Sequence, residues 1–355
     1  MQLQPFSVND GDGIRTTIFM AGCPLRCKWC SNPEGFTPQE KVGWYQRKCI
    51  GCGACAEVCP QGIGVNMNAP VAVALLSEAA PESITFQNGS TAQGNSENSL
   101  ERDRCIVCGR CTEVCPVEAR TKMVTLTDAD DILKQIQKHR LFYSYSGGGV
   151  TFSGGEATSQ PELLDYLSRE IYDMGYSMDI ETCGMFDFDR LAPVLARMDL
   201  IFMDLKTMDP EKHLEYTGVS NDRILQNIAN LAKLQDLRCE SSQSTHSDHG
   251  ALQACADSEK RIGNDGKGPE IVIRIPVVGG VNDDEDNIRS SAAYVHRYLP
   301  HARMELLPYH RYGMIKYEAL GIQYEHPDFS TPGKAEMERL RDIVGSEGVE
   351  VADFR

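Results

Sequence analysis

Cysteines at short, repeated spacings are the residues of this sequence best suited to chemistry. Cys23, Cys27 and Cys30 form a C-x3-C-x2-C loop, and no fourth cysteine follows closely. A [4Fe-4S] cluster normally takes four thiolate ligands, so a loop of three predicts a cluster with one open, reactive iron. Taken alone, so short a motif can also be a chance grouping of unliganded core cysteines.

Two further cysteine groups repeat a longer pattern. Each reads C-x2-C-x2-C-x3-C-P, as in bacterial ferredoxins, in which the fourth cysteine of each run binds the other cluster. This rule predicts two closed, electron-carrying [4Fe-4S] clusters. Structural zinc sites are the alternative, but zinc does not require this third cysteine or the final Cys-Pro. The expected ligand sets are Cys49, Cys52, Cys55 and Cys115 for one cluster, and Cys59, Cys105, Cys108 and Cys111 for the other.

The composition limits the class of protein. A chain of 355 residues, 41% hydrophobic and 24% charged, suits one large globular domain and a smaller one. Its net charge of -16 argues against a nucleic-acid partner, because such proteins usually present a basic face. No apolar run approaches the roughly 18 residues that span a bilayer, and the first residues do not resemble a signal peptide. We therefore expect a cytoplasmic protein without membrane contact, whose 14 cysteines bind metal rather than form disulfides.

Short apolar and β-branched runs alternate with helix-like segments and position these cysteines. The run at 16–22 ends just before the first cysteine loop, which places that loop at the C-terminal end of a strand. Such alternation implies parallel strands with right-handed crossovers, and hence an α/β fold: an open, partial (β/α)6 TIM-like barrel. Its chemistry should lie at the strand C-termini. Further strands are expected at 150–153, 178–182, 200–205, 271–278 and 304–307, and helices at 128–140 (with Thr127 as N-cap), 160–174, 221–235, 284–299 and 334–344.

Residues 43–120 interrupt this series and predict an inserted α+β ferredoxin-like domain, which leaves 1–42 and 121–355 for the barrel. Two polar stretches, 73–100 and 240–268, are expected to be surface insertions, because their composition cannot build a core. A metal site in the second stretch is the alternative. Its candidate ligands are Cys239, just before the stretch, and His246, His249 and Cys255.

Several motifs occur in a fixed order along the chain, and each falls at or just after a predicted strand end. They are Phe6-Ser7-Val8-Asn9-Asp10-Gly11 with Gly13-Ile14-Arg15, the cysteine loop with Ser31-Asn32-Pro33-Glu34, Phe152-Ser153-Gly154-Gly155-Glu156, Glu181-Thr182-Cys183-Gly184, Met203-Asp204-Leu205-Lys206 with His213 and Thr217-Gly218, Arg274-Ile275-Pro276, and Leu307-Pro308-Tyr309-His310 with Gly313 and Lys316-Tyr317. Together they resemble the glycyl radical enzyme activating enzymes, a branch of the radical S-adenosylmethionine (radical SAM) superfamily. The resemblance covers nearly the whole chain outside the two polar stretches.

The resemblance implies that S-adenosylmethionine (SAM) chelates the open iron of the three-cysteine cluster through its amino and carboxylate groups. Gly154 and Gly155 would let the backbone approach the methionine moiety, and Glu156 would support that turn. The remaining residues expected around SAM are Trp29 and His310 at the adenine, Ser31 beside Cys30, the segment Asp204, Leu205 and Lys206 at the ribose and carboxylate, and Arg274 lining the pocket.

Some relatives also bind a monovalent cation beside the methionine carboxylate, through an acid and a threonine of one strand and an acid of the next. Glu181, Thr182 and Asp204 match these positions, although Glu replaces the usual Asp at the first. The resemblance therefore leaves a monovalent cation as an additional candidate ligand.

The implied activity is reductive cleavage of SAM to methionine and a 5′-deoxyadenosyl radical, which removes a hydrogen from a glycine of a partner glycyl radical enzyme. A donor such as flavodoxin or ferredoxin would supply the electron through the two ferredoxin-type clusters. Two alternatives stay open: a radical SAM enzyme acting on another peptide or small molecule, and an electron-transfer iron-sulfur protein.

Overall fold

The computed structural model describes residues 2–64, 104–241, 268–326 and 328–354. Contacts divide the chain into two compact units, a larger one of residues 1–39, 126–311 and 326–355 and a smaller one of residues 40–125 and 312–325. The polar stretch 73–100, almost all of 240–268 and the metal site considered there lie outside the described residues. No helix within the described ranges is long and apolar enough to cross a membrane.

The larger unit is built on an eight-stranded sheet in the order β1-β2-β5-β6-β7-β8-β9-β10. The six longer parallel strands follow one another in sequence order, which confirms the predicted partial barrel. They are β2 (Arg15–Met20), β5 (Gly149–Gly154), β6 (Ser177–Thr182), β7 (Leu200–Asp204), β8 (Glu270–Val277) and β9 (Arg303–Pro308).

Two edge strands of this sheet were not predicted. β1 (Gln2–Ser7) pairs antiparallel with β2, and β10 (Glu350–Val351) pairs parallel with β9. Most residues of β1 are exposed and β10 has only two residues, so neither contains the buried apolar run by which the other strands were recognised.

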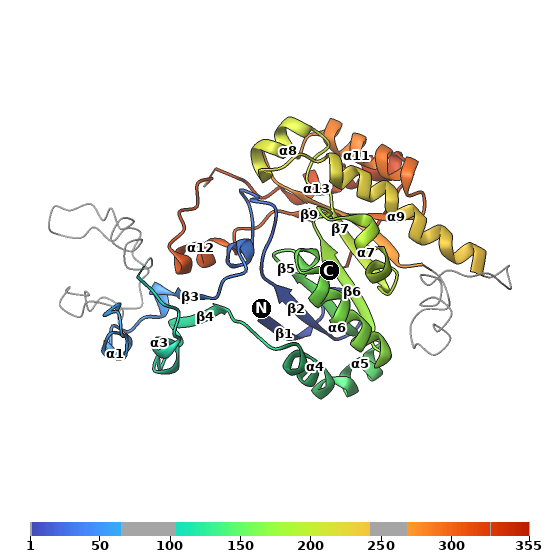
Figure 1. Ribbon diagram of the computed structural model, residues 1–355. Helices are drawn as coiled ribbons and strands as arrows, with labels where there is room; N and C mark the ends of the chain where they lie inside the picture. The colour runs from blue at the N-terminus through green and yellow to red at the C-terminus, as the bar shows by residue number, and fades with distance from the viewer. Residues whose placement is uncertain (1, 65–103, 242–267, 327, 355) are drawn as a thin grey trace. The chain divides into compact units, whose positions relative to one another are not determined.

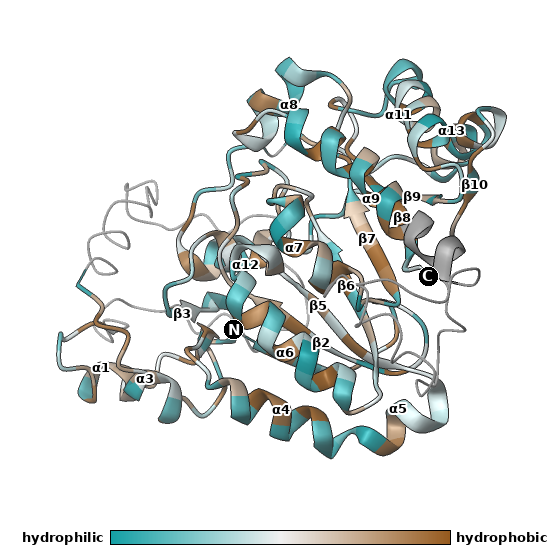
Figure 2. Cartoon of the chain, turned by 45° about the vertical axis from the view of Figure 1, so that its right-hand side comes forward, coloured by the Kyte–Doolittle hydropathy of each residue, from teal (hydrophilic) through white to brown (hydrophobic). Residues whose placement is uncertain are grey.

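Helices lie between the strands along the chain and cover the sheet (Figure 1), and their buried apolar side chains form one continuous core with those of the sheet. In α6, for example, Leu164, Leu167 and Ile171 are fully buried, and Figure 2 shows brown and teal patches alternating along this helix and α4. The N-cap of α4 is Asp128 rather than the expected Thr127, because the Asp128 carboxylate accepts the Asp130 N–H. The helices are η1 (Pro33–Phe36), α4 (Ala129–Lys138), α5 (Arg140–Ser146), η3 (Ala157–Ser159), α6 (Pro161–Asp173), α7 (Phe188–Leu195), α8 (Pro210–Thr217), α9 (Asp222–Ser241), α11 (Glu285–Tyr298) and α13 (Lys334–Ser346).

The smaller unit contains a two-stranded antiparallel sheet, β3 (Lys41–Trp44) with β4 (Arg120–Val124). Its two cysteine runs fold alike: Gly53 and Gly109, with φ of 78° and 77°, precede the matching short helices. A residue with a side chain rarely adopts this left-handed conformation, so the repeated glycine fixes the same turn twice. The helices are η2 (Gln46–Lys48), α1 (Ala54–Glu57), α3 (Arg110–Glu113) and α12 (Met314–Leu320).

The segment Tyr312–Glu325 also belongs to the smaller unit, whereas the sequence expectation left it with the barrel. Ala319 and Leu320 of α12 form a buried apolar cluster with Met123 of β4, and Tyr45 packs against this cluster. The apolar side chains that close the smaller unit thus come from a segment remote in sequence.

Candidate active site and cluster sites

A cavity of about 320 Å³ lies at the C-terminal ends of the parallel strands of the larger unit. The three cysteines of the first loop line it, together with nearly all residues expected around SAM: Trp29, Ser31, Gly154, Gly155, Glu156, Glu181, Thr182, Asp204, Lys206, Arg274 and His310. Leu205 does not line the cavity. It is fully buried in the apolar core, because it points away from the side on which Asp204 and Lys206 lie.

The end of helix α8 holds the cysteine loop in place. The backbone N–H groups of Arg26 and Lys28 donate to the carbonyls of Thr217 and Tyr216 at 2.7 and 2.9 Å. Inside the loop, the N–H of Cys30 donates to the Cys27 carbonyl at 3.0 Å. The positions of the three thiols therefore depend on a helix almost 200 residues further along the chain.

His213, Thr217 and Gly218 shape this end of α8. His213 is fully buried, and its Nδ1 lies 2.7 Å from the carbonyl oxygen of Val219, which can only accept, so Nδ1 carries the proton. Gly218 has a φ of 81° and ends the helix in a left-handed turn. Burial lowers the pKa of His213, which favours the neutral ring. These motif residues position the cysteine loop and do not line the cavity.

The thiols in the cavity suit a cationic iron centre. Burial raises the pKa of Cys27 to about 12 and that of Cys30 to about 11, so the thiolates that a cluster needs are unfavourable here without metal charge. A hydrogen bond with Cys183 lowers the pKa of Cys23. Cys183, for which the sequence suggested no cluster, also lines the cavity.

The Gly-Gly-Glu turn after β5 is dictated by close backbone packing. A Cβ on Gly154, whose φ is +114°, would lie 2.3 Å from the Met20 carbonyl oxygen, and one on Gly155 would lie 2.4 Å from that of Gly35. The buried Glu156 carboxylate accepts hydrogen bonds from the N–H and hydroxyl of Thr158, the hydroxyl of Thr182 and the N–H of Cys183, at 2.6 to 3.0 Å. Glu156 thereby ties the end of β5 to the end of β6.

Charged groups on β6, β7 and β8 neutralise one another in the cavity wall. Arg274 donates to Glu181 at 2.6 Å and to Glu305 at 2.7 Å, and Ser153 donates to the other Glu181 oxygen at 2.5 Å. Lys206 Nζ lies 2.5 Å from Asp204. Burial raises the pKa of Glu181, and the nearby Arg274 opposes this rise.

This arrangement does not fit the monovalent cation considered from the sequence. Glu181 is already paired with Arg274, and Asp204 with Lys206. The Thr182 hydroxyl donates to Glu156 and accepts the Gly184 N–H. The side chains of Arg274 and Lys206 thus already balance the carboxylates that a bound ion would balance, and we assign no role to a monovalent cation.

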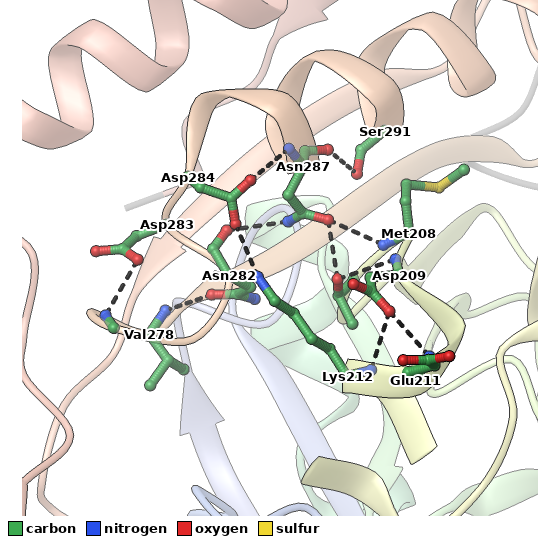
Figure 3. A network of polar contacts seen from close by, with 12 residues as sticks. Met208, Asp209, Glu211, Lys212, Val278, Asn282, Asp283, Asp284, Asn287 and Ser291 are labelled. Carbon is green, nitrogen blue, oxygen red and sulfur yellow. Dashed lines mark hydrogen bonds and ion pairs between the residues drawn. The ribbon is translucent and has the colours of Figure 1, made fainter. Parts of the chain in front are cut away.

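Two buried asparagines, which the sequence analysis missed, hold the loops after β7 and β8 (Figure 3). Asn282 donates to the Lys206 carbonyl at 2.6 Å and to the Pro276 carbonyl at 2.9 Å. Asn287 accepts from the Thr207 hydroxyl and the Met208 N–H, at 3.0 and 2.9 Å. This network fixes the backbone that carries Lys206. Their position after a predicted strand was the only available signal.

The motif that ends in Arg15 lies at the opposite end of the strands, which corrects the expectation that every motif follows a strand. Arg15 begins β2, and its guanidinium lies 3.0 Å from Asp179, near the start of β6. A Cβ on Gly11 would lie 1.9 Å from the Asp179 carboxylate, so the loop packs tightly here. Burial raises the pKa of Asp179 to about 8. These residues close the N-terminal end of the sheet and are remote from the cavity.

The cysteines of the smaller unit surround two cavities. One is lined by Cys49, Cys52, Cys55 and Cys115, and the other by Cys59, Cys105, Cys108 and Cys111. In each set, one cysteine comes from the other run. Among the described residues, no three His, Cys, Asp or Glu side chains converge on a point where they could hold a single ion. Thiols around a cavity suit a cluster that fills the space between them better than a single zinc ion.

Comparison with known proteins agrees with these sites. A family model described as the Radical SAM superfamily matches residues 103–239, and one described as a 4Fe-4S dicluster domain matches residues 48–119. The (2S)-3-sulfopropanediol dehydratase activating enzyme of Klebsiella oxytoca is 34% identical over 91% of this chain and 85% of its own length. The indoleacetate decarboxylase activating enzyme of Tractidigestivibacter scatoligenes is 31% identical over 98% of this chain and 94% of its own. The choline trimethylamine-lyase activating enzyme of Oleidesulfovibrio alaskensis is 32% identical over 96% and 93%.

The partial barrel with its three-cysteine cavity defines the class, a radical SAM enzyme. Within this class the chain belongs to the glycyl radical enzyme activating enzymes that carry a dicluster ferredoxin domain. The resemblance stated from the motifs is thereby confirmed.

Proposed function

We propose that this enzyme binds SAM in the cavity of the larger unit and directs a radical at a glycine of a glycyl radical enzyme. The observation that carries this proposal is the single cavity in which three cysteines meet Asp204, Lys206 and Arg274. A cluster held by Cys23, Cys27 and Cys30 would supply the one electron needed to cleave the S–C5′ bond of SAM to methionine and a 5′-deoxyadenosyl radical, and this radical would take a hydrogen from the glycine.

The residues of the chain bind and orient the reactants. Cys23, Cys27 and Cys30 would hold the cluster, and the hydrogen bonds between their loop and the end of α8 keep these cysteines at the cavity. Asp204, Lys206 and Arg274 offer charged groups for the ribose and the methionine carboxylate. Trp29 and His310 line the same cavity and suit the adenine, because an aromatic face stacks on a base. Ser31, Gly154 and Gly155 also line this cavity.

The smaller unit suits the delivery of electrons. Its two four-cysteine cavities would hold closed [4Fe-4S] clusters, with the ligand sets Cys49, Cys52, Cys55, Cys115 and Cys59, Cys105, Cys108, Cys111. A closed cluster offers no iron to a substrate, so its role is electron transfer. We assign the electron source to a small protein donor, a flavodoxin or ferredoxin.

The test is to mix the reconstituted, reduced enzyme and SAM with the glycyl radical enzyme encoded beside it. We expect equimolar methionine and 5′-deoxyadenosine, and a glycyl doublet in the electron paramagnetic resonance (EPR) spectrum of the partner. A partner whose glycine is changed to alanine is the matched control. Formation of 5′-deoxyadenosine without the doublet would contradict the assigned target, and absence of both would contradict the chemistry.

A further inference from the structure

Two residues of the smaller unit lie between its two cluster cavities. Among the described residues, Trp44 and Arg120 are the ones that line both. They face each other across the β3–β4 ladder, and the Arg120 guanidinium carbon lies 4.9 Å from the centre of a Trp44 ring. A guanidinium over an aromatic face is held there by cation–π attraction, so the two side chains act as one stacked pair.

Both side chains have a shielded N–H group without an acceptor. Trp44 Nε1 and Arg120 Nε are hidden from solvent and have no hydrogen-bond partner within the described part of the chain. A buried donor left unsatisfied costs about 1 to 3 kcal/mol, and native proteins rarely leave two together. Both residues line the two cysteine cavities, and a cluster bound there would bring sulfur acceptors close to them, because the sulfur atoms of iron-sulfur clusters accept hydrogen bonds.

Arg120 brings one positive charge to both sites. It lines the cavity that contains Cys111 and also the cavity that contains Cys115. Cys111 and Cys115 are assigned to different clusters, so the same guanidinium lies beside both.

We propose that Trp44 and Arg120 form a shared donor pair that hydrogen-bonds to sulfur on both clusters and raises both reduction potentials. The proposal rests on the cluster assignment within the proposed function. Reduction adds negative charge to a cluster, and a buried cation or N–H donor stabilises the reduced form most. Because both residues line both cavities, the pair acts on both clusters, and the higher potentials make both clusters easier to reduce.

The experiment is EPR-monitored potentiometry on the reconstituted full-length protein and three variants. Arg120→Met removes the charge and the N–H, and we expect both four-cysteine clusters to shift to lower potential. Trp44→Phe keeps an aromatic ring and removes only the N–H, so a smaller shift in the same direction is expected. Arg47→Met is the matched control, since it removes an arginine of the same unit whose side chain is 80% exposed, and both potentials should stay unchanged.

Each result decides the proposal. Unchanged potentials in Arg120→Met, or a shift of one cluster alone, would overturn the shared role. If Arg120→Met does not retain its iron, Trp44→Phe and Arg120→Lys are measured instead. Unchanged reduction potentials in Trp44→Phe would overturn the donor role. The potentials of Arg120→Lys should stay closer to those of the parent protein, because lysine keeps the charge. Potentials are measured without SAM turnover. A protein that forms no 5′-deoxyadenosine but shows these shifts would therefore refute the proposed function and leave the donor pair standing.

Discussion

The two units of this chain surround their cysteines in opposite ways. In the larger unit, three thiols lie in a cavity whose wall comes from the ends of six different strands or their loops, and an extensive apolar core supports these strands. In the smaller unit, eight thiols surround two cavities between short turns, next to an apolar cluster of Met123, Ala319 and Leu320. A site for chemistry needs a frame that exists before the cofactor arrives, whereas a site for electron transfer can use its cofactor as the core.

The sharpest test of this contrast removes one ligand from each kind of site. Cys30→Ala should reduce 5′-deoxyadenosine formation to background, because two cysteines cannot hold the reactive cluster. Cys108→Ala should retain activity with a small chemical reductant and lose most of it with a protein donor. Product is measured by chromatography with both reductants. If the two variants lost 5′-deoxyadenosine formation equally with the chemical reductant, the proposed difference between the two kinds of cysteine site would be wrong.

Removal of all clusters should affect the two units differently. After chelation under oxidising conditions, we expect backbone amides of α1, α3, β3 and β4 to lose protection in hydrogen exchange, because empty cavities leave the smaller unit with little core. Amides of α6 and α11 should keep theirs, since their partners belong to the main core. The reconstituted protein is the control. Retained protection in the smaller unit would show that its clusters are not structural.

The barrel frame should be sensitive to its buried charges. Arg274→Met leaves Glu181 and Glu305 without their buried partner, and we expect a loss of about 3 to 5 kcal/mol in the free energy of unfolding. Arg289→Met is the matched control, since its pair with Glu347 is partly exposed and should contribute about 1 kcal/mol or less. Denaturant unfolding measures both. Adding Glu181→Gln to Arg274→Met should recover part of the loss, and no recovery would argue against the pairing.

The smallest expected effect concerns the support of the cysteine loop by α8. Burial lowers the pKa of His213, so below its ordinary value of about 6.5 the unfolded chain binds a proton that the folded chain resists. The stability from this residue is complete above pH 6.5 and declines as the pH falls further. When the pH is lowered from 7.5 to 5.5, the free energy of unfolding of His213→Asn should fall by up to about 1 kcal/mol less than that of the parent protein. His301 is exposed, so His301→Asn is the control for loss of a histidine. If the free energy of unfolding depended on pH equally in the two variants, His213 would not be the source of this pH dependence.

Local sequence patterns predicted those strands and helices whose formation depends on residues close together in the sequence. The six parallel strands were recognised because each is a short buried apolar run, and most of the longer helices because of their apolar spacing. The cysteine spacing in turn suggested the clusters. The structure brings together nearly all the expected cavity residues, but Leu205 points into the core.

Features with a tertiary cause could not be predicted in this way. Asn282 and Asn287 hold the loop after β7 by hydrogen bonds to backbone groups of Lys206 and Met208. These contacts join segments far apart in the sequence, so no local sequence pattern predicts them. The same holds for Arg120, because the two cavities that it lines form only when the chain is folded. Arg15 shows the converse: a motif of the family was read as part of the site, although it closes the other end of the sheet.

Helix α12 gives the smaller unit a particular order of maturation. The ribosome releases residues 40–125 well before Tyr312–Glu325, and the intervening chain contains five of the six parallel strands. During synthesis, Met123 therefore has no Ala319 or Leu320 to cover it until most of the barrel has emerged. We therefore expect the segment that supplies the eight cysteines to be less stable when it is excised without α12, and its apolar cluster to be complete only after α12 has been synthesised.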